Sequence, residues 1–258
     1  MSRPRLLLVP EFTEVEWTIK PRLDGWAEVA SFDLPGVGDE PLPEGDPNLL
    51  TRDVVTRRGL EELDRHGWER CFIVADGWGL AAAVLIAQAR PQAVQGMALG
   101  HAMLSFRTEG ERAPQSAELR AALTQLIHQD YEAFIRHGIA QATAGSVDVD
   151  LATKMLERFP KELMELGWER ITTDDVPIGD ILHELDPPLL LAKHEGCLMS
   201  TDEGFEDAAA AFPKARTIAV PDAPHVSEEF AEAVREFCTE VAGGAEPRGA
   251  HSRARPAG

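Results

Sequence analysis

The segment from residue 71 to residue 89 constrains the fold more than any other part of this chain. Cys71–Ala75 is an unbroken apolar run, and residues 80–89 form a longer run of small and apolar side chains. Only Asp76-Gly77-Trp78-Gly79 separates the two runs. Their lengths, and the glycines between them, indicate a buried strand, a tight turn and a buried helix. We therefore expect a strand–turn–helix unit of an α/β domain.

The same alternation of apolar runs and helical patterns recurs on both sides of this unit. We expect an α/β fold with a mostly parallel sheet of about six strands and helices on both faces. The expected strands are residues 6–9, 28–32, 71–75, 94–99, 189–192 and 216–220. The expected helices are residues 53–65, 78–90, 203–212 and 227–241.

The alternation stops between residues 114 and 185, where the sequence has helical patterns and no strand pattern. This interruption predicts a helical cap inserted into the α/β core. We assign residues 1–104 and 186–242 to the core and residues 105–185 to the cap. Residues 243–258, rich in Gly, Pro, Arg and Ala, are expected to be a disordered tail.

The charge of the chain limits its partners. Its formal net charge of −19 disfavours nucleic acid and anionic membranes. We expect a small-molecule ligand instead, and homodimer formation is left open. The three cysteines are far apart in the sequence, which fits a reducing compartment, and we predict a cytoplasmic protein.

Three motifs, in this order, resemble those of capped α/β-hydrolases. The first is the loop Asp33-Leu34-Pro35-Gly36-Val37-Gly38, and the second is the turn Val74-Ala75-Asp76-Gly77-Trp78-Gly79. The third is the closing segment from Phe212 to Pro221-Asp222-Ala223-Pro224-His225. The resemblance covers nearly all of residues 5–241 and implies an α/β-hydrolase fold with its active site at the carboxyl ends of the strands.

Matched to that family, the chain lacks most of the usual catalytic groups. The elbow is Gly77 followed by Trp78, so glycine occupies the nucleophile position. The family's oxyanion loop corresponds to Pro10-Glu11, and its acid position corresponds to Gly196. Only the catalytic histidine, His225, is retained as the resemblance implies.

We therefore predict His225, Glu195 and Asp76 as the catalytic candidates. His225 is a general acid or base in this interpretation, and Glu195 substitutes for the missing acid. Asp76 is a weaker candidate for a nucleophile, because it stands one residue before the elbow position and its side chain should point elsewhere.

Further residues are expected around the same cavity. His101 and His194 stand at the ends of two different strands, and the loop after the first strand contributes Glu11, Phe12 and Trp17. Each has a plainer interpretation, as a hydrogen-bonded strand-end histidine or as part of a solvated acidic loop. We expect no metal, because no pair of these residues has ligand spacing, and no cofactor.

Two functional hypotheses follow. The first is an enzyme that acts on a small organic molecule by histidine acid/base chemistry, such as elimination, isomerisation or cyclisation. The alternative is a non-catalytic small-molecule-binding or accessory protein that keeps the pocket of a hydrolase. A hydrolase inactivated by substitution of residue 77 is disfavoured, because the oxyanion and acid positions also depart from the family.

Overall fold

The structure is a computed structural model. It describes residues 3–10, 19–37, 51–102, 104, 117–143, 149–173, 176–195 and 201–244. The last helix ends at Ala242. Of the predicted tail, residues 243–258, only Gly243 and Gly244 are among the described residues.

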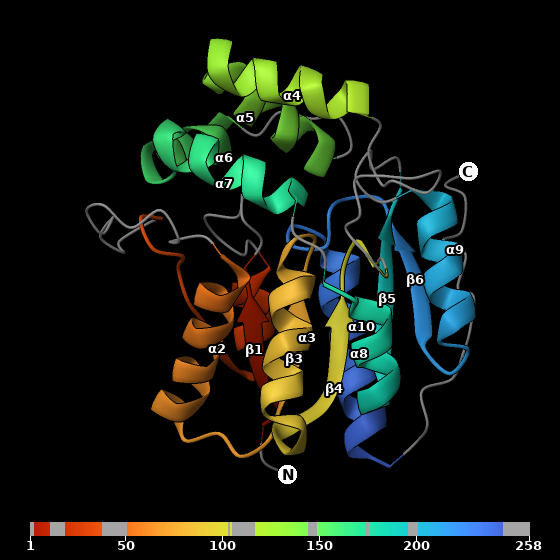
Figure 1. Ribbon diagram of the computed structural model, residues 1–258. Helices are drawn as coiled ribbons and strands as arrows, with labels where there is room; N and C mark the ends of the chain where they lie inside the picture. Colours follow the sequence, from red (N-terminus) through yellow and green to blue (C-terminus); the bar gives the residue numbers. More distant parts are fainter. Residues whose placement is uncertain are drawn as a thin grey trace.

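A six-stranded, fully parallel sheet forms the centre of the molecule (Figure 1). Its strand order is β2-β1-β3-β4-β5-β6, so β3 and β4 lie in the middle. The predicted fold class is confirmed, and each strand lies where the apolar runs placed it. The strands are β1 Arg5–Val9, β2 Glu28–Ser31, β3 Cys71–Ala75, β4 Val94–Leu99, β5 Leu189–His194 and β6 Arg216–Val220.

Helices cover both faces of this sheet. Helices α2, α3 and α8 lie on one face, and α1 and α10 pack against the other (Figure 1). The helices are α1 Lys20–Asp24, α2 Arg52–His66, α3 Gly79–Ala89, α4 Ala117–Gln129, α5 Tyr131–Ala142, α6 Val149–Arg158, α7 Lys161–Thr173, α8 Ile178–Leu185, α9 Asp202–Ala211 and α10 Glu228–Ala242, with a short 3-10 helix at Pro91–Ala93.

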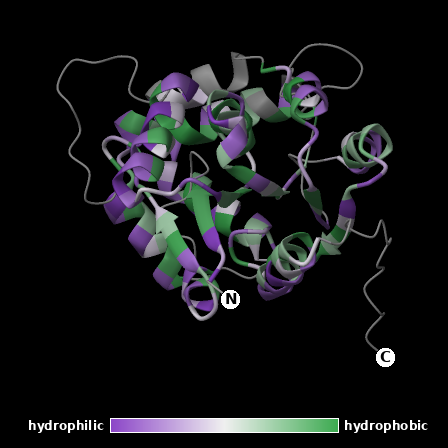
Figure 2. Cartoon of the chain, turned by 90° about the horizontal axis from the view of Figure 1, so that it is seen from below, coloured by the Kyte–Doolittle hydropathy of each residue, from purple (hydrophilic) through white to green (hydrophobic). Residues whose placement is uncertain are grey.

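The strands supply both hydrophobic cores because successive side chains of a strand point to opposite faces. Leu7 and Ile73 belong to the core under α2 and α3, whereas Leu8 and Phe72 belong to the core under α10. Viewed from below, the strands are hydrophobic in the interior and hydrophilic residues face outward (Figure 2). This double burial explains why the strand sequences are continuous apolar runs.

Helices α4 to α7 lie beyond the carboxyl ends of the strands, at the top of Figure 1. Their aromatic side chains contact one another, with Phe134 5.7 Å from Trp168 and 6.3 Å from Tyr131 between ring centroids, and they join the hydrophobic core under α2 and α3. Helix α8 falls within the segment predicted as cap, but it packs against α3 beside the sheet. The division of the chain into core and cap at residues 105 and 185 stays a prediction.

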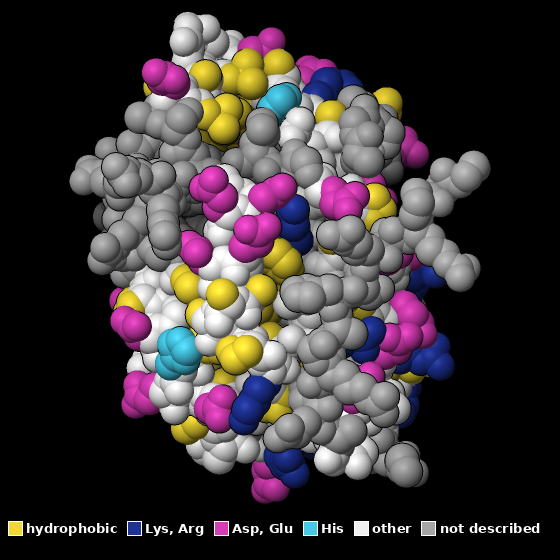
Figure 3. All heavy atoms as spheres, turned by 90° about the vertical axis from the view of Figure 1, so that its right-hand side faces the viewer, with side chains coloured by type: hydrophobic (Ala, Val, Ile, Leu, Met, Phe, Trp, Pro, Cys, Tyr) yellow, Lys and Arg dark blue, Asp and Glu magenta, His cyan; other side chains and the backbone are white. Residues whose placement is uncertain are grey.

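Acidic side chains are prominent on the surface. They gather on the face that carries α9 (Figure 3), where Asp202, Glu203 and Glu206 are exposed. Among the described residues, no helix has the length and apolar character needed to cross a membrane.

Candidate active site

The turn between β3 and α3 positions the candidate site. Gly77 has a φ of +48°, in the left-handed region that glycine adopts without strain. Gly79 begins α3 directly against the end of β1, and a Cβ atom there would lie 2.8 Å from the carbonyl oxygens of Val9 and Pro10. Gly79 is thus required by the close approach of the backbone, whereas the φ of Gly77 favours glycine; together they bring the start of α3 over the end of β1.

Asp76 lies at the carboxyl end of β3 and is completely buried. Its Oδ2 atom accepts hydrogen bonds from the ring Nδ1 of His225, at 2.8 Å, and from the backbone N–H of the same residue, at 3.2 Å. His225 lies in the loop between β6 and α10 and is partly exposed. A buried carboxylate therefore orients the histidine that the sequence singled out.

The second oxygen of Asp76 contacts another histidine. Oδ1 lies 2.6 Å from Nδ1 of His101, and Nε2 of His101 lies 3.2 Å from Nδ1 of His194. Both rings are buried, with 7% of His101 and 2% of His194 exposed. His225, Asp76, His101 and His194 thus form one hydrogen-bonded chain across the ends of β3, β4, β5 and the loop after β6.

Gly100 makes room for this chain. A Cβ atom at this position would collide with Oδ1 of Asp76 and would lie 2.6 Å from Cβ of Pro224. The next residue, His101, has a φ of +46°, a left-handed conformation that is uncommon outside glycine and that asparagine, aspartate and histidine adopt more often than other residues. The backbone after β4 is therefore shaped to place an imidazole beside Asp76.

The electrostatics of the site favour an ionised Asp76. Burial alone would raise the pKa of its carboxyl group, because a charge is poorly solvated in the interior. The charge and hydrogen bond of His101 act in the opposite direction, as do those of His225, and together they hold the pKa of Asp76 well below its ordinary value. The carboxylate is thus an acceptor for both imidazoles.

The structure changes the role of two predicted residues. We expected Glu195 to act as the acid partner of His225, but Glu195 is exposed and the carboxylate on His225 is Asp76. Asp76, predicted as a weak nucleophile candidate, is instead the hydrogen-bond acceptor for His225 and His101. Glu195 follows β5 and binds through its backbone N–H to the carbonyl of Val220 at 2.9 Å.

The remaining predicted residues are either buried or outside the described part of the chain. Trp78 is 3% exposed at the start of α3. Glu11, Phe12, Trp17 and Gly196 lie outside the described residues. Within the described ranges, no cluster of three or more His, Cys, Asp or Glu side chains has an arrangement suited to a metal ion.

Two cysteine thiols of the described chain are unsuited to nucleophilic chemistry. Cys71 and Cys238 are fully buried in the cores. Burial raises the pKa of the Cys71 thiol to about 12, although Arg5 opposes the shift, and it raises the pKa of Cys238 still further above its ordinary value. A thiolate, the reactive form, is therefore disfavoured at both positions.

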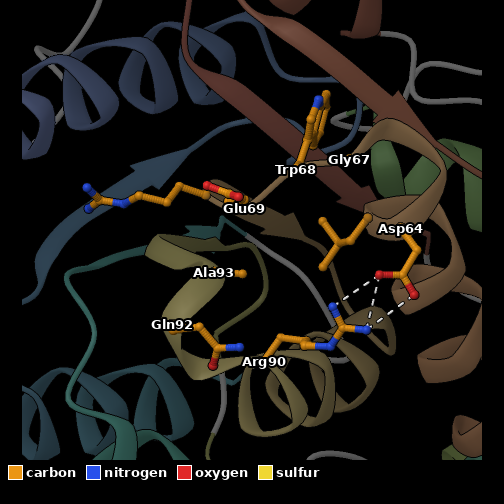
Figure 4. A pocket seen from close by; sticks show the side chains of 9 residues that line it. Asp64, Gly67, Trp68, Glu69, Arg90, Gln92 and Ala93 are labelled. Carbon is orange, nitrogen blue, oxygen red and sulfur yellow. Dashed lines mark hydrogen bonds and ion pairs between the residues drawn. The ribbon is translucent and has the colours of Figure 1, made fainter.

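A hollow of 490 Å³ lies at the other end of the sheet (Figure 4). It is lined by residues that precede β3 and β4, including Trp68 and Gln92, and by the ion pair between Arg90 and Asp64. Since the strands are parallel, the residues that precede them lie at one end of the strands, and the residues that follow them lie at the opposite end. The hollow is thus separate from Asp76 and His225.

Comparisons with known proteins agree on the fold. Neither a protein-family model nor a curated protein sequence matches this chain. Solved structures do match it: a hydrolase from Oleispira antarctica is 12% identical, with a TM-score of 0.76, over 93% of this chain and 92% of its own. An enol-lactonase from Burkholderia xenovorans is 17% identical, with a TM-score of 0.69, over 93% of each chain.

An α/β hydrolase from Novosphingobium aromaticivorans is also similar, at 17% identity and a TM-score of 0.68, over 93% of this chain and 90% of its own. The sheet order, the elbow between β3 and α3 and these similarities together establish that the chain has the α/β-hydrolase fold. Within that fold, the turn after β3 carries Gly77, and the buried Asp76 beside it is paired with His225.

Proposed function

We propose that this protein is an enzyme in which His225 acts as general acid and base on a small organic molecule bound between the α/β core and the helical segment above it. The observation that carries the proposal is the 2.8 Å hydrogen bond between His225 Nδ1 and the buried carboxylate of Asp76. A carboxylate that accepts from Nδ1 fixes the ring and leaves Nε2 as the nitrogen that exchanges protons.

The turn at residue 77 argues against a covalent mechanism. An acyl or alkyl enzyme needs a nucleophilic side chain beside its base. Gly77 has no side chain, and the carboxylate of Asp76 is buried and bound to two histidines. Chemistry at this site is then proton transfer to and from the bound molecule, as in isomerisation, elimination or cyclisation.

An enol lactone is a suitable first probe, because one protein with the same fold is an enol-lactonase. In α-angelica lactone, Nε2 of His225 would remove a proton from the carbon between the carbonyl group and the double bond. The double bond then moves into conjugation with the carbonyl group, and the imidazolium returns the proton to the far end of the dienolate. The product is β-angelica lactone, and no bond to the protein forms.

The test is isomerisation of α-angelica lactone, followed by ultraviolet absorbance, with proton NMR in D₂O to detect exchange at carbon. We expect turnover above the buffer rate, a loss of about 10²- to 10⁴-fold in His225→Ala, as for other general acid–base groups, and a large loss in Asp76→Asn. His137→Ala, which removes an exposed histidine of α5, should leave the rate unchanged.

The non-catalytic alternative gives a different result. A wild-type protein that binds the lactone but neither isomerises it nor exchanges its protons would support a binding or accessory role. Hydrolysis of the lactone through a covalent intermediate, detected by mass spectrometry of the protein, would contradict the proposed mechanism.

A further inference from the structure

Asp76 accepts more hydrogen bonds than the orientation of one histidine requires. Oδ2 accepts from the backbone and ring of His225, and Oδ1 is the acceptor for His101 at 2.6 Å. Catalysis by His225 uses only the Oδ2 side. The contacts on Oδ1 have no part in the mechanism above, although a buried carboxylate oxygen left without a donor is costly.

The positions of the ring nitrogens determine where the protons lie. Because Asp76 is ionised, it can only accept, so Nδ1 of His101 must carry a proton, as must Nδ1 of His225. Nε2 of His101 lies 3.2 Å from Nδ1 of His194, and this contact is satisfied whether Nε2 accepts from His194 in a neutral ring or donates to it from a charged ring. In both cases Nδ1 of His101 carries the proton that Asp76 accepts.

We propose that His101 is a positioning residue of the site: supported by His194, it holds the Asp76 carboxylate in the ionised form and orientation that His225 needs. Its catalytic meaning rests on the proposed function. His101 contacts Asp76, and His194 contacts His101, so in this proposal they act on His225 through Asp76.

The backbone supports a specific role for His101. Its φ of +46° costs free energy for most side chains, and such conformations persist where the surrounding structure determines them. Here the strained residue follows Gly100, whose missing side chain admits Asp76. Both features serve the contact between His101 and Asp76.

Burial raises the pKa of Asp76, and His101 and His225 lower it. Without His101, fewer groups would oppose the effect of burial. The ionisable groups that the described chain places around Asp76 are His101 at the end of β4, His225 in the loop after β6, and His194 of β5 through His101. Without His101, burial favours the neutral carboxyl group. A protonated carboxyl group orients His225 less well.

Two variants separate this role from simple packing. His101→Gly removes the imidazole and tolerates a positive φ, whereas His101→Asn tolerates the same φ and keeps an N–H donor near the place of Nδ1. We expect His101→Gly to lower kcat for lactone isomerisation about 10- to 100-fold with little change in KM, and to move the acidic limb of the pH profile upward. His101→Asn should restore most of kcat.

Nitrogen-15 NMR of the histidine rings tests the inference without turnover. In the wild type, we expect both His101 and His225 to be protonated at Nδ1, with His225 losing this preference in His101→Gly. A wild-type His101 protonated only at Nε2 would overturn the proposal, even if His101→Gly does not fold. An unchanged His225 ring and pH profile in folded His101→Gly would overturn it too. If the wild type shows the expected ring protonation but no isomerisation, the proposed function fails while the positioning role stands.

Discussion

Asp76 and His225 are 149 positions apart in the sequence, yet His225 donates to one oxygen of Asp76 through both its backbone and its ring. The loop after β6 is therefore attached to the end of β3, three strands away in the sheet. Such a pair couples the ionisation of Asp76 to the folded state, and its consequence for stability is measurable.

Asp76→Asn should change how stability depends on pH. The pKa of Asp76 is lower in the folded protein than in the unfolded chain, so its ionised form stabilises the fold above about pH 4. That contribution is lost as the pH falls toward the lower, folded-state pKa. We expect the difference in unfolding free energy between wild type and Asp76→Asn to be largest near neutral pH and to shrink in acid.

Urea denaturation at a series of pH values measures this difference. Glu206→Gln, which makes the same kind of change at an exposed position of α9, is the control and should leave the curve unchanged. A difference between wild type and Asp76→Asn that stays constant from neutral to acidic pH would contradict the depressed pKa.

Gly100→Ala should destabilise the protein and disturb the site together. The added methyl group would collide with Asp76 and lie 2.6 Å from Pro224. Overpacking of this kind typically costs about 1–3 kcal/mol. Gly138→Ala is the matched control: nothing lies within 4 Å of its added Cβ, and alanine in a helix stabilises by about 0.5–1 kcal/mol relative to glycine. Thermal unfolding of the two variants should shift in opposite directions, and equal shifts would refute the steric argument.

The sheet was predictable because its strands are buried on both faces and therefore appear as continuous apolar runs. The sequence also showed that Asp76 stands one residue before the elbow position and that His101 follows the neighbouring strand. It could not show that Asp76 replaces Glu195 as the partner of His225, because that depends on where the β6–α10 loop returns. A buried aspartate at the end of a central strand, beside a histidine that ends the next strand, was the available signal.

Gly100 was not singled out from the sequence, because glycine occurs at the ends of strands for many structural reasons. Only the three-dimensional approach of Asp76 and Pro224 shows why a side chain is excluded there. The helical segment was also recognisable from its periodicity, but periodicity could not show that α8 packs against α3 while α4 to α7 lie above the strands.

Gly77→Ser tests whether a serine at residue 77 becomes a reactive nucleophile beside His225, as in a serine hydrolase. A serine at this position would stand beside an aspartate–histidine pair, so we expect labelling by a fluorophosphonate that disappears in the double variant with His225→Ala. Wild type, without a hydroxyl group at residue 77, is the negative control. Failure of the variant to react would contradict the placement of His225 as the base for this position.

Turnover of p-nitrophenyl esters by Gly77→Ser should nevertheless remain poor. Pro10 has no backbone N–H, and the sequence has Pro10-Glu11 where an oxyanion-binding loop would be expected. Removal of one oxyanion donor typically costs about 10²- to 10³-fold in rate. Turnover by this variant at the rate of an ordinary esterase would indicate that the chain needs only one substitution to hydrolyse esters.

The last prediction concerns the motion of α4 to α7. The central strands β3 and β4 are paired on both sides and covered on both faces, whereas the helical segment lies at one end of the sheet. Its described polar links to the core include the ion pair between Arg158 and Asp33, at 3.3 Å, and the hydrogen bond from the Ala223 N–H to the Ala142 carbonyl, at 2.7 Å. We expect faster amide hydrogen exchange in α4 to α7 than in β3 and β4, and slower exchange in the helices when lactone is bound.

Arg158→Ala should accelerate exchange in α6 without affecting β3 or β4. Both partners of this ion pair are partly exposed, so its loss should cost less than about 1 kcal/mol, or a rate increase of at most about fivefold. Arg136→Ala, which removes an ion pair internal to α5, is the control because it does not connect the helices to the core. Hydrogen-exchange mass spectrometry resolves these segments. Exchange in α4 to α7 as slow as in β3 and β4, both with and without lactone, would contradict the expectation that these helices unfold locally more often than the central strands.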